Sequence, residues 1–386
     1  MNNETNLFRR MPGWIVLACL FCGLDQAPKP LGLQAREGRF YKDGQPYRGV
    51  GANYFDLLRR VLHDPTNTTS LAGLEQLSKA GIPFVRFAGP FTAQEWKLYV
   101  DNKEEYFRRF DLVVRAAEKS GIGLIPSMFW TLTLCETVGE PRDQWGNPQS
   151  KTVALMRQYV SDVVGRYKNS PALWAWEFGN ETNLKTDLPN AAQYRPKGGS
   201  VRDDVTAAHL ATMLSEFAKE VRRHDPARAI LSGNSHARPT AWNNTANKNW
   251  TSDTQAQAKT IILRDNPAPL DTIGVHVYGD SENPRKELGE WVSGRLHYFQ
   301  WLKGVAREVG RPVFVGEFGL ARPKDGRNER QVFEALLAEM GQAGIDLAAF
   351  WVYDLSSQEK TWNVTFDNER AYMISLTAEA NRRWGL

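Results

Sequence analysis

The sequence predicts an α/β protein that folds as a single closed (β/α)8 TIM barrel with a short N-terminal hairpin. Eight short, nearly continuous apolar runs alternate with longer amphipathic segments along the 386 residues, as expected for parallel strands buried on both faces. Several amphipathic segments end at a glycine that a strand closely follows, the usual end of a helix. An open doubly wound sheet usually carries a GxGxxG turn after its first strand, and this sequence has none there.

The hairpin comes first. Asp43-Gly44 separates Phe40-Tyr41 from Tyr47, and an Asp-Gly pair between such residues indicates a tight turn. A glycine-rich strand at 50–53 follows. We expect one folded domain over residues 36–386, because barrels of this length are common and no linker or short repeat interrupts the chain.

The remaining elements follow in alternation. Strands are expected at 50–53, 84–89, 122–129, 173–179, 229–233, 272–278, 313–318 and 347–353. The clearest helices are expected at 70–80, 104–120, 151–167, 204–224, 290–309 and 329–343. The polar stretches 182–203 and 237–254 are interpreted as long loops after the fourth and fifth strands. In a barrel such loops build the active face.

Residues 1–27 have the pattern of an export signal. Arg9 and Arg10 precede an apolar run at 14–24, which is too short to span a bilayer. Cleavage near Ala27 is one interpretation. The other is a lipoprotein signal, because residues 16–19 (VLAC) resemble the box in which Cys19 would carry a lipid anchor. Both predict an exported protein that is secreted, periplasmic or lipid-anchored at the cell surface.

The composition excludes several classes of partner and cross-link. Outside the signal, Cys135 is the only cysteine, so neither an intrachain disulfide nor a cysteine zinc site is expected. The net charge is +4, and no segment interleaves Lys and Arg with aromatic residues, so nucleic acid is not an expected partner. The 13 tryptophans suit either a large core or a sugar-binding cleft.

Two glutamates carry the chemistry. Glu181 follows LWAWEFGN, and Glu317 follows PVFVG, so each comes at the end of an apolar strand and both reach the same end of a parallel barrel. Retaining glycoside hydrolysis needs such a pair, one carboxyl protonated to release the leaving sugar and the other ionised to attack the anomeric carbon. Other functional side chains at strand ends are Arg86, Asn180, His276, Tyr278 and Trp351.

The order VRF, FGNET, HVY, VGEFG and a tryptophan on the eighth strand resembles glycoside hydrolase family 5, the cellulase and mannanase family, from about residue 48 to 354. The resemblance implies that Glu181 is the general acid/base and Glu317 the nucleophile, with no metal or organic cofactor. It also implies a bond from Asn180 to the sugar 2-hydroxyl, Arg86 and Tyr278 beside Glu317, His276 near the acid/base or the sugar, and Trp351 as a stacking floor.

Elementary electrostatics agrees with these roles. A cation and a phenol beside Glu317 favour its carboxylate form. Glu181, with fewer cationic partners, is expected to keep a raised pKa and to hold a proton. The two carboxyls should lie about 5 to 5.5 Å apart. Glu177 is on the same strand face as Glu181, deeper in the barrel, and is interpreted as a buried partner of other polar groups.

The substrate is less determined by the sequence. Trp130, in SMFWTLTL, stands where many cellulase-type members carry a histidine, and as an apolar wall or platform it favours the mannanase-like branch. We therefore expect an endo-β-1,4-mannanase-like enzyme that acts on a β-linked polysaccharide or oligosaccharide. The alternatives are a cellulase-like endo-β-glucanase, an exo-β-glycosidase, and a catalytically silent carbohydrate-binding barrel. Trp145, Trp242, Trp250 and Trp291 are candidates for outer subsites.

Overall fold

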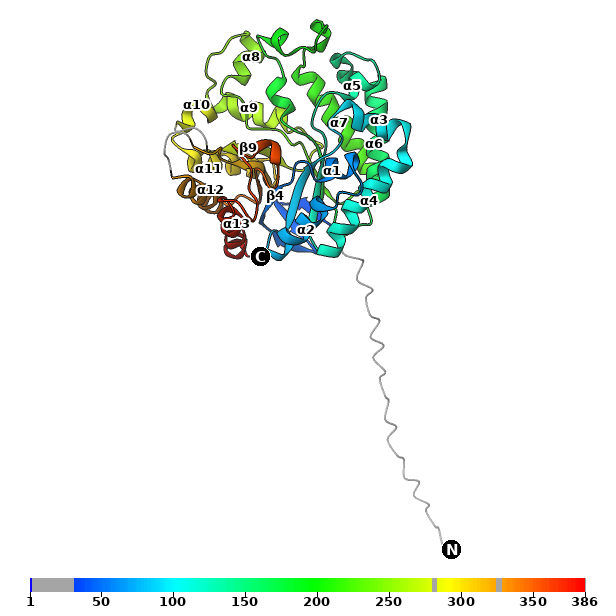
Figure 1. Cartoon of the computed structure of the whole chain (residues 1–386). Helices are drawn as coiled ribbons and strands as arrows, with labels where there is room; N and C mark the ends of the chain where they lie inside the picture. The colour runs from blue at the N-terminus through cyan, green and yellow to red at the C-terminus, as the bar shows by residue number, and fades with distance from the viewer. Residues whose placement is uncertain (2–30, 280–282, 324–327, 386) are drawn as a thin grey trace.

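The barrel predicted from the sequence is confirmed. A computed structural model describes Met1 and residues 31–279, 283–323 and 328–385. Eight parallel strands form one nearly closed sheet in the order β8-β7-β6-β5-β4-β11-β10-β9, and helices surround it (Figure 1). The strands are β4 (Gly49–Asn53), β5 (Phe84–Ala88), β6 (Gly123–Phe129), β7 (Ala175–Gly179), β8 (Ala229–Leu231), β9 (Ile273–Tyr278), β10 (Val313–Gly319) and β11 (Leu347–Phe350).

The six predicted helices are present, together with others that the sequence did not indicate. The predicted six are α2 (Thr69–Lys79), α4 (Lys103–Ser120), α6 (Lys151–Tyr167), α7 (Ala207–His224), α11 (Arg295–Glu308) and α12 (Glu329–Ala343). The additional ones are α1 (Leu57–His63), α3 (Ala93–Asp101), α5 (Leu134–Thr137), α8 (Ala241–Asn247), α9 (Gln255–Asp265), α10 (Pro284–Leu288) and α13 (Tyr372–Trp384). The expected loop at 237–254 therefore contains a helix.

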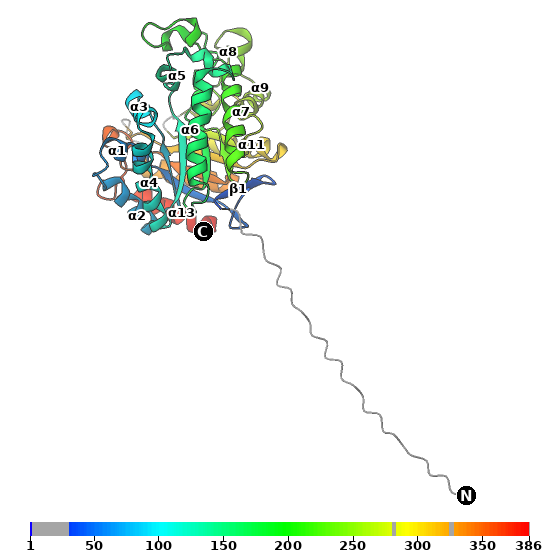
Figure 2. The ribbon, with the colours of Figure 1, turned by 90° about the vertical axis from the view of Figure 1, so that its right-hand side faces the viewer.

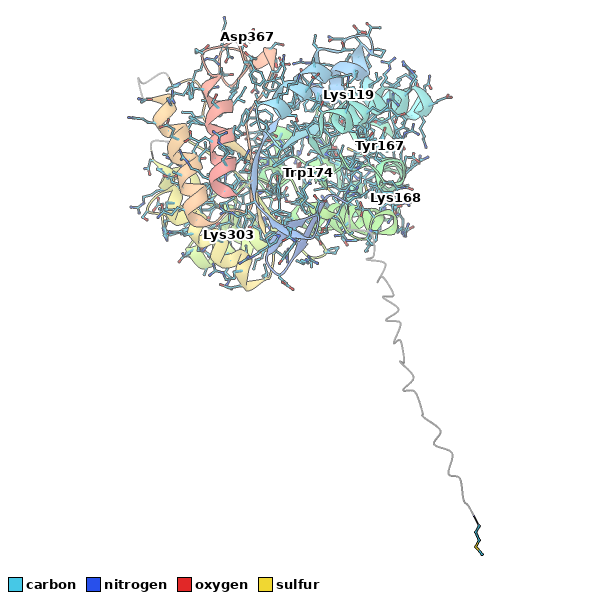
Figure 3. The ribbon with its side chains drawn as sticks, turned by 90° about the horizontal axis from the view of Figure 1, so that it is seen from below. Lys119, Tyr167, Lys168, Trp174, Lys303 and Asp367 are labelled. Atoms are coloured by element: carbon cyan, nitrogen blue, oxygen red, sulfur yellow. The ribbon has the colours of Figure 1, made fainter. Side chains whose placement is uncertain are left out.

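The hairpin closes the end of the barrel where the strands begin. It consists of β1 (Leu33–Arg36), β2 (Arg39–Lys42) and β3 (Gln45–Tyr47), with Asp43 and Gly44 at positive φ in the predicted turn. Leu33 and Phe40 pack in one buried cluster with Trp174, which Figure 3 labels near the middle of this end. In Figure 2, β1 and α13 lie at the lower end, while α5 and α8 lie at the upper end.

Side chains complete the barrel at the seam between β8 and β9. Asn266 is fully buried and accepts from Ser232 Oγ at 2.7 Å and from the Gly274 N–H at 2.9 Å. Its amide donates to the carbonyls of Ile262 at 3.1 Å and Gly274 at 3.2 Å. The Asn266 side chain thus links the residue that follows α9 to the start of β9 and to Ser232, directly after β8.

Replacing Asn266 by alanine is expected to lower the free energy of unfolding by about 3 kcal/mol, because buried backbone groups of Gly274 lose their partners. Urea unfolding followed by circular dichroism measures this change. Asn169→Ala is the matched control, since Asn169 is exposed and should change stability by less than about 0.5 kcal/mol. Equal effects of the two substitutions would contradict the proposed closure of the seam.

The predicted export signal at residues 1–27, with Cys19, lies outside the described residues. Within them, none of the helices combines the length and the apolar character that crossing a membrane requires. Cys135 is buried and unpaired with another cysteine, and its thiol donates to the Leu132 carbonyl at 2.7 Å. Burial raises the pKa of this thiol to about 11, so Cys135 stays protonated and serves as part of the core.

Candidate active site

All eight site residues predicted from the sequence lie on barrel strands or directly after their carboxyl ends. Their positions are Arg86 on β5, Trp130 directly after β6, Asn180 and Glu181 directly after β7, His276 and Tyr278 on β9, Glu317 on β10, and Trp351 directly after β11. The contacts among them bring most of these side chains to one place. They also recruit residues that the sequence analysis had not selected.

Glu317 is held from two sides. Arg86 Nη1 donates to its Oε1 at 2.8 Å, and the hydroxyl of Tyr278 donates to its Oε2. Only 3% of Glu317 is exposed. Burial, followed by the nearby charge of Glu317, raises the pKa of Tyr278 well above its usual range, so the phenol remains a donor at neutral pH. These contacts hold the carboxylate in a fixed orientation.

Arg86 is the centre of the buried polar network. Its Nε donates to Glu177 Oε2 at 2.6 Å, and its Nη1 also donates to Asn53 Oδ1 at 2.9 Å. Nη2 donates to Asn180 Oδ1 at 2.9 Å. The interpretation of Glu177 as a buried partner is confirmed. Asn53 was missed, although a polar residue at the end of the first barrel strand was a signal of the same kind as those used.

A glycine after β8 allows the backbone to place Glu181. Glu181 has φ +50°, and its N–H donates to the Gly233 carbonyl at 2.8 Å. A Cβ at Gly233, where φ is +70°, would lie 1.8 Å from the Gly179 carbonyl oxygen, so only glycine permits this close approach of the loops after β7 and β8.

The electrostatics of Glu181 differ from the prediction. Burial raises its pKa, but the hydrogen bond from His276 and the charges of His276 and His236 outweigh burial and lower the pKa to about 2. His276 Nδ1 lies 3.0 Å from Glu181 Oε1 and 3.5 Å from Glu317 Oε2. The expected scarcity of cationic partners was therefore wrong, because the loop after β8 and the strand β9 bring two histidines to Glu181.

The two carboxylates are close together. Oxygen atoms of Glu181 and Glu317, with a ring nitrogen of His276, all lie within 4.8 Å of one another. This separation suits the retaining geometry of about 5–5.5 Å and is shorter than the roughly 6.5–9.5 Å of inverting pairs. Among the described residues these three are the only cluster with metal-ligand spacing. Arg86 and Tyr278 already bond both oxygens of Glu317, which favours acid–base and nucleophilic chemistry there.

Aromatic rings lie beside the polar groups of the site. Trp130 stacks on Trp351 with ring centroids 5.8 Å apart, and Phe55 packs edge-on against Trp130 at 4.8 Å. The Arg86 guanidinium lies 4.9 Å from the centre of the Trp130 ring. The indole N–H of Trp351 donates to Gln358 Oε1 at 2.9 Å. Trp130 and Trp351 thus form a stacked aromatic pair beside Arg86, while Phe55 and Gln358 are contributors that the sequence did not single out.

The four tryptophans considered for outer subsites have different surroundings. Trp145 is fully buried and packs against Phe129 and Phe178, so it belongs to the core. Trp242 and Trp291 pack on the main core as partly buried residues. Trp250 is 52% exposed and remains a candidate.

Comparisons with known proteins identify the family of the chain. The family model described as Cellulase (glycosyl hydrolase family 5) matches residues 43–356. Mannan endo-1,4-beta-mannosidase 8 of Oryza sativa subsp. japonica is 23% identical over 326 residues, which is 75% of this chain and 79% of the relative. Mannan endo-1,4-beta-mannosidase 1 of the same plant is 24% identical over 365 residues, or 82% and 77% of the two chains.

Solved structures share the fold. The structure of the endo-1,4-beta-mannanase from Rhizomucor miehei superposes with a TM-score of 0.63 at 15% identity, covering 92% of this chain and 99% of that one. Since the family model spans most of the residues from the hairpin turn to the loop after β11, the chain belongs to glycoside hydrolase family 5 and is a glycosidase that hydrolyses glycosidic bonds.

Proposed function

We propose that this protein is a retaining endo-β-1,4-mannanase in which Glu317 is the nucleophile and Glu181 the general acid/base. The observation that carries the mechanism is the carboxylate pair within 4.8 Å, of which one member is held by Arg86 and Tyr278 and the other by His276. The two environments differ, as the two roles require. The presence of both glutamates in one site argues against a catalytically silent barrel.

The reaction has two steps. In the first, Glu317 bonds to the anomeric carbon while Glu181 gives its proton to the glycosidic oxygen, and the bond to the leaving sugar breaks. In the second, Glu181 takes a proton from water, whose oxygen bonds to the anomeric carbon and displaces Glu317. Asn180 accepts from Arg86 through Oδ1, which leaves its Nδ2 to donate to the 2-hydroxyl of the sugar above Trp351.

Glu181 must be protonated for the first step, although its pKa is about 2 in the ligand-free protein. A bound sugar removes water from the carboxyl and raises its pKa, because burial disfavours the charged form. His276 Nδ1 lies 3.0 Å from Glu181 Oε1, and this hydrogen bond favours the ionised form of the carboxyl. His276 is therefore proposed to set the proton affinity of the acid.

Replacing His276 by alanine is expected to raise the pKa of Glu181 and to move the alkaline limb of kcat/KM to higher pH. The sign follows because activity needs protonated Glu181, and the lost hydrogen bond and charge favoured the ionised form. The rate at the optimum should also fall, since Glu181 loses an orienting contact. His276→Asn, which can still donate, should shift the limb less; an unshifted profile in both variants would argue against this role.

Mannan is supported as the substrate by two observations. The curated relatives compared above are mannan endo-1,4-beta-mannosidases. In addition, Trp130 rather than a histidine stands behind the stacking residue Trp351. The test is product release from β-1,4-mannan, glucomannan, carboxymethylcellulose and β-1,3-glucan. Preferred release of mixed short oligosaccharides from mannan supports the proposal. Preference for carboxymethylcellulose indicates an endo-β-glucanase, and release of a single small product from chain ends indicates exo action.

We also propose that the enzyme works outside the cytoplasm, either free or anchored through lipid on Cys19. The support is the pattern of Arg9 and Arg10 before the apolar run at 14–24. Metabolic labelling with a fatty acid, compared between the wild type and Cys19→Ser, separates the anchored form from the cleaved one.

A further inference from the structure

His236 lies beside the catalytic pair and has no part in the steps above. It follows β8, and its Nδ1 is 2.9 Å from the carbonyl oxygen of His276. Because a carbonyl only accepts, Nδ1 carries the proton in this contact, and in the neutral ring Nε2 carries the lone pair. Among the described residues none forms a hydrogen bond with Nε2, and this atom is not buried. The Nδ1 edge of the ring is therefore fixed, and the Nε2 edge is available to bind a ligand.

The segment that carries His236 is firmly held. Asn183 Nδ2 donates to the Ser235 carbonyl at 3.0 Å, and Asn183 Oδ1 accepts from the Ser235 N–H at 3.0 Å. Arg238 Nη1 donates to the Asn183 carbonyl at 2.9 Å. These bonds join the loop after β8 to the loop after β7, directly beyond Glu181. His236 is thus pre-positioned, and ordering it on binding costs little.

The strand order places His236 on the side of the leaving group. Trp130 and Trp351 follow β6 and β11, which flank β5 and β4 in the sheet, so the stacking surface covers that half of the barrel. Glu181 and His236 follow β7 and β8, which are neighbours in the opposite half. With one sugar over Trp351, the bond that Glu181 protonates points to the half above β7 and β8. When it is protonated, His236 lowers the pKa of Glu181, which agrees with this proximity.

We propose that His236 binds the sugar that leaves in the first step, with Nε2 accepting a hydrogen bond from one of its hydroxyl groups. The inference rests on the proposed retaining mechanism and names a contact in the leaving-group subsite. His236 would then act in both directions of the first step. It would bind the sugar that leaves, and it would bind a sugar that attacks the glycosyl-enzyme in the reverse reaction.

The experiment compares two substrates. One is mannotetraose, whose leaving group is a sugar; the other is 2,4-dinitrophenyl β-mannobioside, whose activated leaving group offers no sugar hydroxyl. His236→Ala should lower kcat/KM for mannotetraose about 10-fold, the effect of one lost hydrogen bond to substrate. The same variant should change kcat/KM for the aryl glycoside by less than about 2-fold.

Two conservative variants separate substrate binding from a structural role. In His236→Gln the amide reaches the position of Nε2, whereas in His236→Asn it replaces only Nδ1 and its bond to His276. Recovery by glutamine but not by asparagine supports the inference. Recovery by asparagine alone, or an equal loss on both substrates, would mean that His236 holds the backbone, and the inference falls. His224→Ala is the histidine control and should match wild type. His224 is the last residue of α7 and precedes the start of β8, whereas His236 follows the end of that strand.

The outcomes also distinguish this inference from the proposed function. A wild-type enzyme that cleaves neither substrate contradicts the proposed function, and the inference with it. A wild-type enzyme that cleaves both, with His236→Ala unchanged on mannotetraose, contradicts only the assignment of His236.

Discussion

Glu317→Ala is expected to reduce the hydrolysis of the preferred polysaccharide by a factor on the order of 10⁵, because the variant cannot form the covalent intermediate. Glu317 accepts from both Arg86 and Tyr278. Glu177, which also pairs with Arg86, is fully buried and cannot take its place. Initial rates of reducing-sugar release, with enough enzyme to detect residual activity, measure the loss.

A small nucleophile provides the sharper readout. With azide and an activated aryl β-mannobioside, Glu317→Ala should yield the α-glycosyl azide, since azide enters the space left by the carboxylate and attacks from the same face. Glu104→Ala is the control, because Glu104 is exposed in the first turn of α4 and should retain full activity. Residual hydrolysis above about 1% of wild type, in protein with an unchanged unfolding temperature, would remove Glu317 from the role of nucleophile.

Much of the fold could be predicted because barrel strands are buried on both faces and therefore read as continuous apolar runs. β6, for example, is buried along its whole length. The helices that were missed are defined by partners distant in sequence. α13 is held where Asn381 accepts from the Val50 N–H at 2.7 Å and donates to the Val50 carbonyl at 2.9 Å. No local pattern near residue 381 reports this contact with the first barrel strand.

The site residues likewise include some that the sequence could predict and some that it could not. Functional side chains at strand ends stood out against their apolar surroundings, so Arg86, Glu181 and Glu317 could be selected from the sequence. Residues that act from loops could not: His236 and Phe55 become recognisable only when the barrel closes. The low pKa of Glu181 was missed because it depends on contacts made in the closed barrel, the hydrogen bond from His276 on β9 and the charge of His236 in the loop after β8.

Glu181→Ala is expected to separate the two steps that Glu317→Ala removes together. Hydrolysis of polysaccharide should fall by a factor on the order of 10⁴, because an unprotonated sugar is a poor leaving group. Cleavage of 2,4-dinitrophenyl β-mannobioside should keep a fast first step, since that leaving group needs no proton. The glycosyl-enzyme then accumulates, and stopped-flow absorbance should show a burst of dinitrophenolate followed by slow turnover.

Azide then tests the geometry of the pair. In Glu181→Ala, azide should accelerate turnover and yield the β-glycosyl azide, because it reaches the intermediate from the side where water normally attacks. The two alanine variants should thus give products of opposite anomeric configuration, as two carboxylates facing each other within 4.8 Å require. Glu136→Ala, in the short helix α5 after β6, controls for the loss of one negative charge and should show neither burst nor azide effect. An α-azide from Glu181→Ala would reverse the assignment of the two glutamates.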